Sequence, residues 1–123
     1  MNYMPQEELK EVASEKFIHL TSRGRNTGKP HKVELWFAIS GTRVYLSHEG
    51  RDTDWMKNIK NNSKVAFEIG GKHFAGNAHL LNDGPEDAWT GKVALYEKYY
   101  GKAAKEIIED WFSLSRLLAI DLS

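Results

Sequence analysis

Apolar residues alternate with polar ones along much of the chain. Val33, Leu35 and Phe37 fall on one side of a segment, and Lys64–Ile69 repeats the same spacing, which is typical of a strand with one buried face. Gly41 and the Gly70-Gly71 pair lie between such segments, where hairpin turns use glycine. The pattern predicts strands over residues 16–22, 33–40, 43–48, 64–69, 72–82 and 115–123.

Helical spacing appears between these strands and predicts helices over residues 5–15, 50–62, 83–100 and 104–111. Pro5 suits a first helical turn, and Asp52 or Thr53 can cap the second helix. Because helices and strands do not alternate strictly, the order disfavours a doubly wound parallel sheet. The expected fold is mainly β with α: a six-stranded, mostly antiparallel barrel with flanking helices.

Composition narrows the class of protein. The chain has 123 residues, 17 Lys+Arg and 17 Asp+Glu, so one domain over residues 1–123 is expected, and nucleic acid is not expected as a whole-domain partner. The absence of cysteine excludes disulfides and thiolate chemistry. No apolar run reaches the length of about 20 residues that crosses a bilayer, and acidic residues near the N-terminus do not suit a signal peptide. We therefore expect a cytoplasmic protein with no membrane partner.

Net neutrality conceals a local excess of positive charge. Residues 16–33 contain no acidic residue and five cationic ones, which are Lys16, Arg23, Arg25, Lys29 and Lys32. Within Thr21–His31, two glycines allow close backbone approach, and arginine can grip a phosphate with two hydrogen bonds. These residues indicate a phosphate or anion site, with an ordinary basic turn as the alternative. It is not a Walker loop, because Pro30 follows Lys29 where that motif needs Ser or Thr.

Two further segments can contact a ligand. In Ser47–Asn58, small polar residues lead into a helix start whose backbone N–H groups favour an anion, although the same residues can simply cap and pack. The Leu35-Trp36-Phe37 segment can face a flat ring or belong to the core. The histidines predict no metal site, since His73 and His79 lie about 20 Å apart along one strand.

Together these segments resemble the flavin-binding split β-barrel proteins, the pyridoxamine 5'-phosphate oxidase-like family. Leu20–His31 followed by Val33–Phe37 is similar to their opening hairpin, and the deazaflavin-dependent nitroreductase branch is the nearest match. The likeness continues through Tyr45–Ser47 and the Asp54-Trp55 pair to Asn62–Val65. It covers about residues 17 to 82 and implies a split barrel that forms a homodimer, with cofactor sites between the subunits.

The resemblance also implies a cofactor, either F420 or FMN, with its phosphate at the basic loop and its ring against the second strand. His31 stands where the family often has Arg. Trp55 stands where many FMN-binding relatives have Lys, which favours F420. The implied cofactor-binding residues are Arg25, Asn26, Thr27, Gly28, His31, Leu35, Trp36, Phe37, Ser47, Arg51, Trp55 and Asn58.

The implied function is that of a nitroreductase-like oxidoreductase, which transfers a hydride between F420 or FMN and a small organic acceptor. Tyr99 and Tyr100 are candidate proton donors, although the Trp- and Tyr-rich helix that carries them can equally be a core element. One alternative is a non-catalytic flavin- or haem-binding protein on the same barrel, with His48 or His79 as a haem ligand. Another is an interaction domain whose aromatic helix forms a dimer face.

Overall fold

The computed structural model describes residues 5–49, 54–81, 85–113 and 115–122. The strands are β1 (Phe17–Arg23), β2 (Pro30–Ser40), β3 (Arg43–Glu49), β4 (Lys64–Ile69), β5 (Lys72–Leu80) and β6 (Ser115–Leu122). The helices are α1 (Pro5–Glu11), α2 (Asp54–Asn61), α3 (Pro85–Tyr100) and α4 (Lys105–Trp111). All six predicted strands and four predicted helices are present. The first helix ends at Glu11 and not at residue 15, and β2 begins at Pro30, three residues before the alternation starts, because the hairpin ladder with β1 extends that far.

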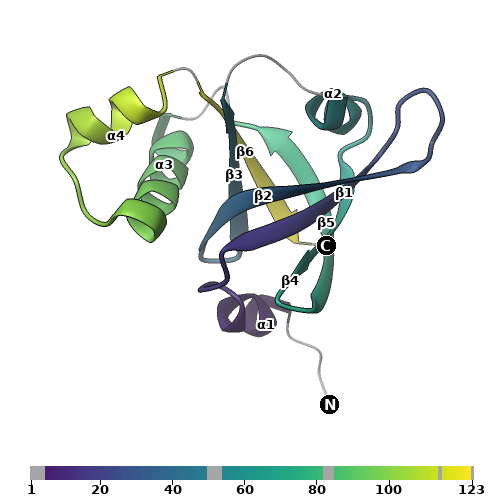
Figure 1. Cartoon of the computed structure of the whole chain (residues 1–123), viewed down its shortest axis with the longest axis horizontal. Helices are drawn as coiled ribbons and strands as arrows, with labels where there is room; N and C mark the ends of the chain where they lie inside the picture. Colours follow the sequence, from purple (N-terminus) through teal and green to yellow (C-terminus); the bar gives the residue numbers. More distant parts are fainter. Residues whose placement is uncertain (1–4, 50–53, 82–84, 114, 123) are drawn as a thin grey trace.

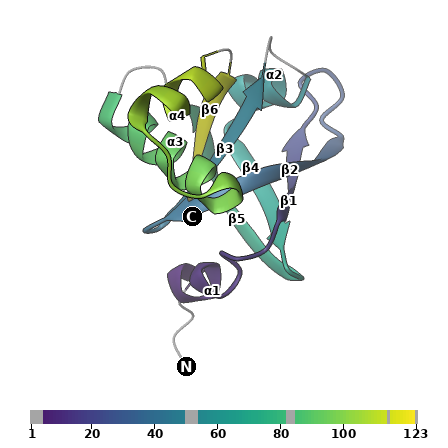
Figure 2. The ribbon, with the colours of Figure 1, turned by 60° about the vertical axis from the view of Figure 1, so that its left-hand side comes forward.

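The strands form a closed barrel in the order β1-β2-β3-β6-β5-β4. All its strand pairs are antiparallel, so the predicted fold class is confirmed. Helices α1 and α2 lie at opposite ends of the barrel, while α3 and α4 pack against one side (Figures 1 and 2). Among the described residues, no helix is long and apolar enough to cross a membrane.

Strand β2 changes its partner halfway along its length. Residues 30–36 pair with β1, and residues 37–40 pair with β3. The first half forms, together with β1, a hairpin arm that extends away from the barrel (Figure 1). Consequently β2 connects the basic loop at one end of the molecule with the helical layer at the other.

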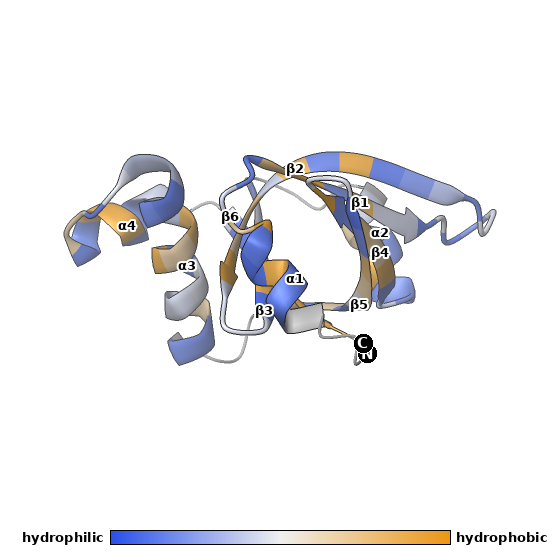
Figure 3. Ribbon diagram, turned by 90° about the horizontal axis from the view of Figure 1, so that it is seen from below, coloured by the Kyte–Doolittle hydropathy of each residue, from blue (hydrophilic) through white to orange (hydrophobic). Residues whose placement is uncertain are grey.

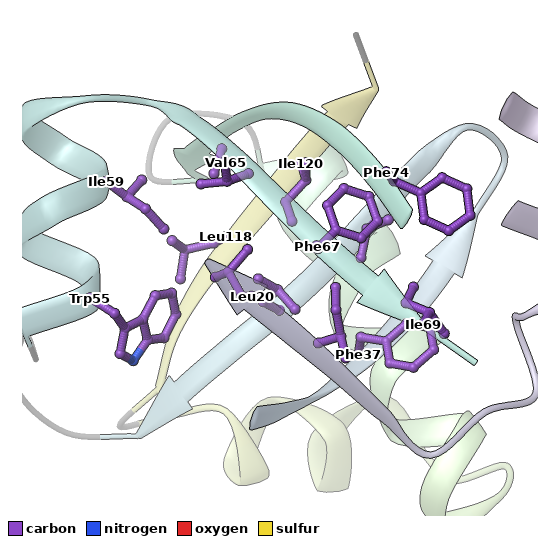
Figure 4. Close-up of a cluster of buried hydrophobic side chains, with 14 of the residues drawn as sticks. Leu20, Phe37, Trp55, Ile59, Val65, Phe67, Ile69, Phe74, Leu118 and Ile120 are labelled. Carbon is purple, nitrogen blue, oxygen red and sulfur yellow. The ribbon is translucent and has the colours of Figure 1, made fainter. Parts of the chain in front are cut away.

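The interior of the barrel holds the main hydrophobic core. Phe37, Leu20 and Phe67 are almost fully buried, and side chains from β1, β2, β4, β6 and α2 converge there (Figure 4). The alternating face predicted for β2 is confirmed, since Val33 and Leu35 pack against this core. Figure 3 shows the alternation as successive hydrophilic and hydrophobic bands along β2.

A second core lies between the barrel wall and helices α3 and α4. Ala38 and Tyr45 contribute from the barrel, and Leu95 and Ile108 from the helices. The close approach depends on Gly91 in α3, because a Cβ at that position would lie only 2.6 Å from the Tyr45 ring. The helical layer is thus packed directly on β2 and β3, which fixes the surface on that side.

Candidate functional site

The loop between β1 and β2 is closed by its own hydrogen bonds. The Gly24 N–H donates to the carbonyl of Lys29 at 2.8 Å, and the Gly28 N–H donates to the carbonyl of Gly24 at 2.8 Å. Gly28 has a φ of 69°, a conformation that favours glycine. The Thr27 hydroxyl accepts from the Lys29 N–H at 3.3 Å. These contacts close the loop on itself through its own backbone and the Thr27 hydroxyl.

Helix α2 fixes the position of this loop through Asn58. The Oδ1 atom of Asn58 accepts from the Arg25 backbone N–H at 3.1 Å and from its guanidinium at 3.0 Å. Asn58 is only 3% exposed, so the pair is anchored in the folded body of the protein. The sequence resemblance had placed both residues at the cofactor, and the structure brings them together across 33 positions of sequence.

A hollow of about 200 Å³ opens at this loop, and we call it the loop hollow. It is lined by Gly24, Arg25, Asn26, Thr27, His31 and Asn58. No carboxylate is among these residues, and Arg25 brings a positive charge. The donor set of guanidinium, hydroxyl, amide and imidazole is suited to the oxygens of a phosphate group.

The predicted ring-facing segment of β2 divides between the two faces of the strand. Phe37 is fully buried inside the barrel and Leu35 is half-buried toward it, whereas Trp36 is 38% exposed on the outer face. The Trp36 ring stacks on Tyr99 with centroids 4.1 Å apart and planes at 9°. Of the three residues, only Trp36 presents an aromatic ring to the outside.

The hydroxyl of Tyr99 is hydrogen-bonded to backbone groups at the point where β2 separates from β1. It accepts from the Phe37 N–H at 3.0 Å and lies 2.8 Å from the Lys16 carbonyl and 2.9 Å from the Phe37 carbonyl, either of which can take its single proton. The β1–β2 ladder ends at Phe17 and Trp36, so the hydroxyl sits between the residues that would form the next pair. Burial raises the pKa of Tyr99, against the effect of the Phe37 hydrogen bond.

Lys98 completes this backbone contact and was not identified from the sequence. Its Nζ donates to the Phe37 carbonyl at 2.9 Å and lies 3.4 Å from the centroid of the Phe37 ring. Burial lowers the pKa of Lys98 to about 8, and the charge of Glu15 opposes that shift. The only sequence signal was its position beside Tyr99 on the aromatic helix. Phe37 therefore has both of its backbone polar groups occupied by α3.

Tyr100 differs from Tyr99 in being open to solvent. It is 50% exposed, and its ring lies 6.0 Å from Trp36 and 5.0 Å from Trp111, measured between centroids. Trp111 is itself 51% exposed, so the three rings form an aromatic row on the surface. The alternative that this helical stripe is core holds only partly: Tyr96 packs against the second core, but Tyr100 does not.

The remaining predicted residues lie in other settings. Ser47 is half-buried on β3. Trp55 is 4% exposed and points from α2 into the barrel core beside Ile59 (Figure 4), which agrees with the packing alternative for that segment. Arg51 lies outside the described residues. The structure therefore brings the loop residues and Asn58 together, and it places Trp36 and Tyr100 in a separate aromatic area.

The chain is similar to one described protein family and to several solved structures. The sequence model of the family described as F420H(2)-dependent quinone reductase matches residues 6–108. Rv2991, a conserved hypothetical protein from Mycobacterium tuberculosis, has a similar structure, with a TM-score of 0.78 and 20% identity over 98% of this chain and 81% of that one. No curated protein matches the chain.

Two further solved structures show the same fold. The F420-H2 dependent reductase FDR-A has a TM-score of 0.64 at 20% identity, covering 85% of this chain and 93% of that one. HutZ, the heme storage protein from Vibrio cholerae, has a TM-score of 0.67 at 15% identity, covering 98% of this chain and 92% of that one. At these identities the likeness concerns the barrel and its helices.

Proposed function

The chain belongs to the F420H(2)-dependent quinone reductase family and is a deazaflavin-dependent oxidoreductase, and we propose that its hairpin loop binds the phosphate of F420. The observation that supports this proposal is the loop hollow and the residues that line it. Arg25 is held there by Asn58, and the hydroxyl of Thr27 lies beside it. These groups are donors that match phosphate oxygens, so the residues present fit the phosphate-bearing part of the cofactor.

In this proposal the cofactor and the protein have different roles in the reaction. When bound, reduced F420 supplies the hydride. The protein's part is to bind, orient and exclude competing reactions, for which the chain needs no nucleophilic side chain. The loop holds the phosphate, and β2 offers the exposed ring of Trp36 on its outer face. We place the cofactor ring beside β2, as the family resemblance implies.

The substrate in this proposal is a small organic acceptor of the quinone type. A quinone that accepts a hydride must also take up a proton to become a hydroquinone. Tyr100 is the tyrosine suited to donate that proton to the quinone, because its hydroxyl-bearing ring is half exposed beside Trp36. Tyr99 is less suited, since its hydroxyl is bonded to the backbone of Phe37 and Lys16.

We also propose that the protein works as a cytoplasmic homodimer with the cofactor between the subunits. Its support is the exposed aromatic row of Trp36, Tyr100 and Trp111, together with the exposed Ile107 on α4. Aromatic residues are enriched in the cores of protein interfaces. Analytical ultracentrifugation of the wild type and of Trp111→Ala measures this directly, and a monomeric wild type would contradict it.

A binding titration tests the cofactor site. Wild-type protein should quench the fluorescence of F420 with saturation, and Arg25→Ala should weaken the affinity by about ten- to a hundredfold, since a charge-assisted hydrogen bond contributes roughly 1.5–3 kcal/mol. Lys10→Ala is the control, because it removes an exposed cation on α1 at the opposite end of the barrel. If Arg25→Ala binds F420 as tightly as the wild type, the loop is an ordinary surface turn.

A further inference from the structure

Strand β2 changes partner at Phe37, one residue past the end of its ladder with β1. The β1–β2 ladder stops at the pair Phe17–Trp36, and the β2–β3 ladder starts at the pair Phe37–Leu46. If the first register continued, Lys16 would lie opposite Phe37, but Lys16 precedes β1. Backbone polar groups that are shielded from water need a partner, so the structure must supply one at the point where the two strands separate.

The hydroxyl of Tyr99 takes the place of that missing pair. Its oxygen accepts from the Phe37 N–H at 3.0 Å and lies 2.8 Å from the Lys16 carbonyl. It therefore stands between an N–H and a carbonyl of the kind that hydrogen-bonded partners of a ladder join directly. Lys98 donates to the Phe37 carbonyl at 2.9 Å, which leaves the single Tyr99 proton for Lys16. One side chain of α3 thus ties together two strands that no longer pair.

The same side chain sets the position of the Trp36 ring. Tyr99 stacks on the indole with ring centroids 4.1 Å apart and planes at 9°. Because the hydroxyl end of Tyr99 is bonded to the backbone, its ring cannot turn away from the indole without breaking these hydrogen bonds. Trp36 is 38% exposed, and exposed side chains otherwise change rotamer within nanoseconds. The stack therefore restricts a surface indole to one orientation.

A fixed ring at this place bears on the proposed reaction. Hydride transfer needs the reacting atoms about 3–3.5 Å apart, and a displacement of about 1 Å can cost roughly a hundredfold in rate. Trp36 presents its ring on the outer face of β2, beside which the proposed function places the cofactor ring. A reacting ring that lies against the indole keeps its distance to the acceptor only if the indole itself is held.

We infer that Tyr99 is a positioning residue of this oxidoreductase, which holds the Trp36 ring as a rigid platform for the reacting rings and contacts neither cofactor nor acceptor. The inference rests on the proposed function, because it takes Trp36 to lie beside the cofactor ring. It gives two neighbouring tyrosines different roles. Tyr100 donates a proton to the acceptor, whereas Tyr99 acts through Trp36.

The orientation of Trp36 can be measured in the free protein. The chain has four tryptophans, so labelling with 5-fluorotryptophan gives four ¹⁹F resonances, and Trp36→Phe identifies the one from residue 36. Tyr99→Phe keeps the ring and removes only the hydroxyl. It should shift or broaden the Trp36 resonance and leave that of Trp55, in the barrel core, in place. An unchanged Trp36 resonance overturns the inference, whichever cofactor the protein binds.

The second measurement is the rate of a single turnover of F420H2 with a soluble naphthoquinone, both at saturating concentrations. Tyr99→Phe should lower this rate about ten- to a hundredfold and change the dissociation constant of F420 less than about twofold, because the loop hollow is untouched. Ile120→Val is the control for stability: it removes one carbon from the barrel core and should lower the Tm without slowing the single turnover. A wild-type rate in Tyr99→Phe would make Tyr99 merely structural and overturn the inference.

A double-mutant cycle shows whether Tyr99 acts through Trp36. Trp36→Leu, at an exposed site, should slow the single turnover at least as much as Tyr99→Phe, and combining the two substitutions should add little further loss. If the two losses multiply, or if Trp36→Leu reacts at the wild-type rate, the inference is wrong. A wild type that neither binds F420 nor oxidises F420H2 contradicts the proposed function and the inference together.

Discussion

The two halves of β2 have different neighbours. Residues 30–36 follow a loop without acidic residues and pair with β1, whereas residues 37–40 pair with β3 beneath α3. In the first half the cavities beside the hairpin are lined by Arg23, Arg25 and Lys64, and among the described residues the buried Ser22 hydroxyl has no hydrogen-bond partner. In the second half the backbone of Phe37 is bonded to Tyr99 and Lys98, and the Phe37 side chain is fully buried. One strand thus combines an end that lies beside an open hollow with an end that is fully packed.

The difference shows where the fold leaves its polar groups available. Polar groups at the packed end satisfy one another, so a ligand there would have to break existing hydrogen bonds. At the loop end, Arg25 is positioned by Asn58 but still lines an open hollow. Substitutions at the packed end should therefore change stability first, and substitutions at the loop end should change binding first.

The largest expected effect is at Phe37. Phe37→Ala should lower the free energy of unfolding by about 3–5 kcal/mol, because it leaves a cavity in the barrel core. Trp36→Ala is the matched control, since the neighbouring aromatic ring is 38% exposed on the outer face and its removal should cost clearly less. Urea unfolding of both variants measures the difference. Equal losses would show that the two faces of β2 are not distinct.

A smaller effect is expected from the tyrosine hydroxyls. Tyr99→Phe should lower the free energy of unfolding by roughly 1–3 kcal/mol, because the Phe37 N–H and the Lys16 carbonyl lose their partner. Tyr100→Phe should change stability by less than about 0.5 kcal/mol, as for an exposed site, and should slow turnover if Tyr100 holds the proton. Full turnover in Tyr100→Phe would remove it as a proton donor.

A pH dependence of stability is expected from Lys98. Burial lowers its pKa from 10.5 to about 8, so the unfolded chain binds this proton more tightly within that interval. Stability rises with pH wherever the unfolded state binds more protons; hence the wild type should gain stability, relative to Lys98→Met, as pH rises from about 8 to 10.5. Unfolding in urea across this pH range tests it, with exposed Lys102→Met as control. Parallel curves for wild type and Lys98→Met would contradict the assignment.

Local patterns predicted the architecture and the basic loop, because both depend on residues close together in sequence. The alternation of β2 and the spacing of Gly24 and Gly28 are visible without a structure. The bond from Arg25 to Asn58 depends on how distant segments meet. The role of Tyr99 was equally hidden, since nothing in its neighbourhood shows that its hydroxyl reaches Phe37. Trp55 matched a motif position, but its burial follows from the packing of α2 on the barrel.

We propose that this chain uses reduced F420 to reduce a quinone-type acceptor. The most direct measurement mixes the purified protein with F420H2 and a soluble naphthoquinone and follows the return of the absorbance of oxidised F420. We expect saturable oxidation with one F420H2 consumed for each quinone reduced, and a large loss of rate at subsaturating F420H2 in Arg25→Ala. No oxidation above the rate without protein, at F420H2 concentrations where binding is saturated, would contradict it.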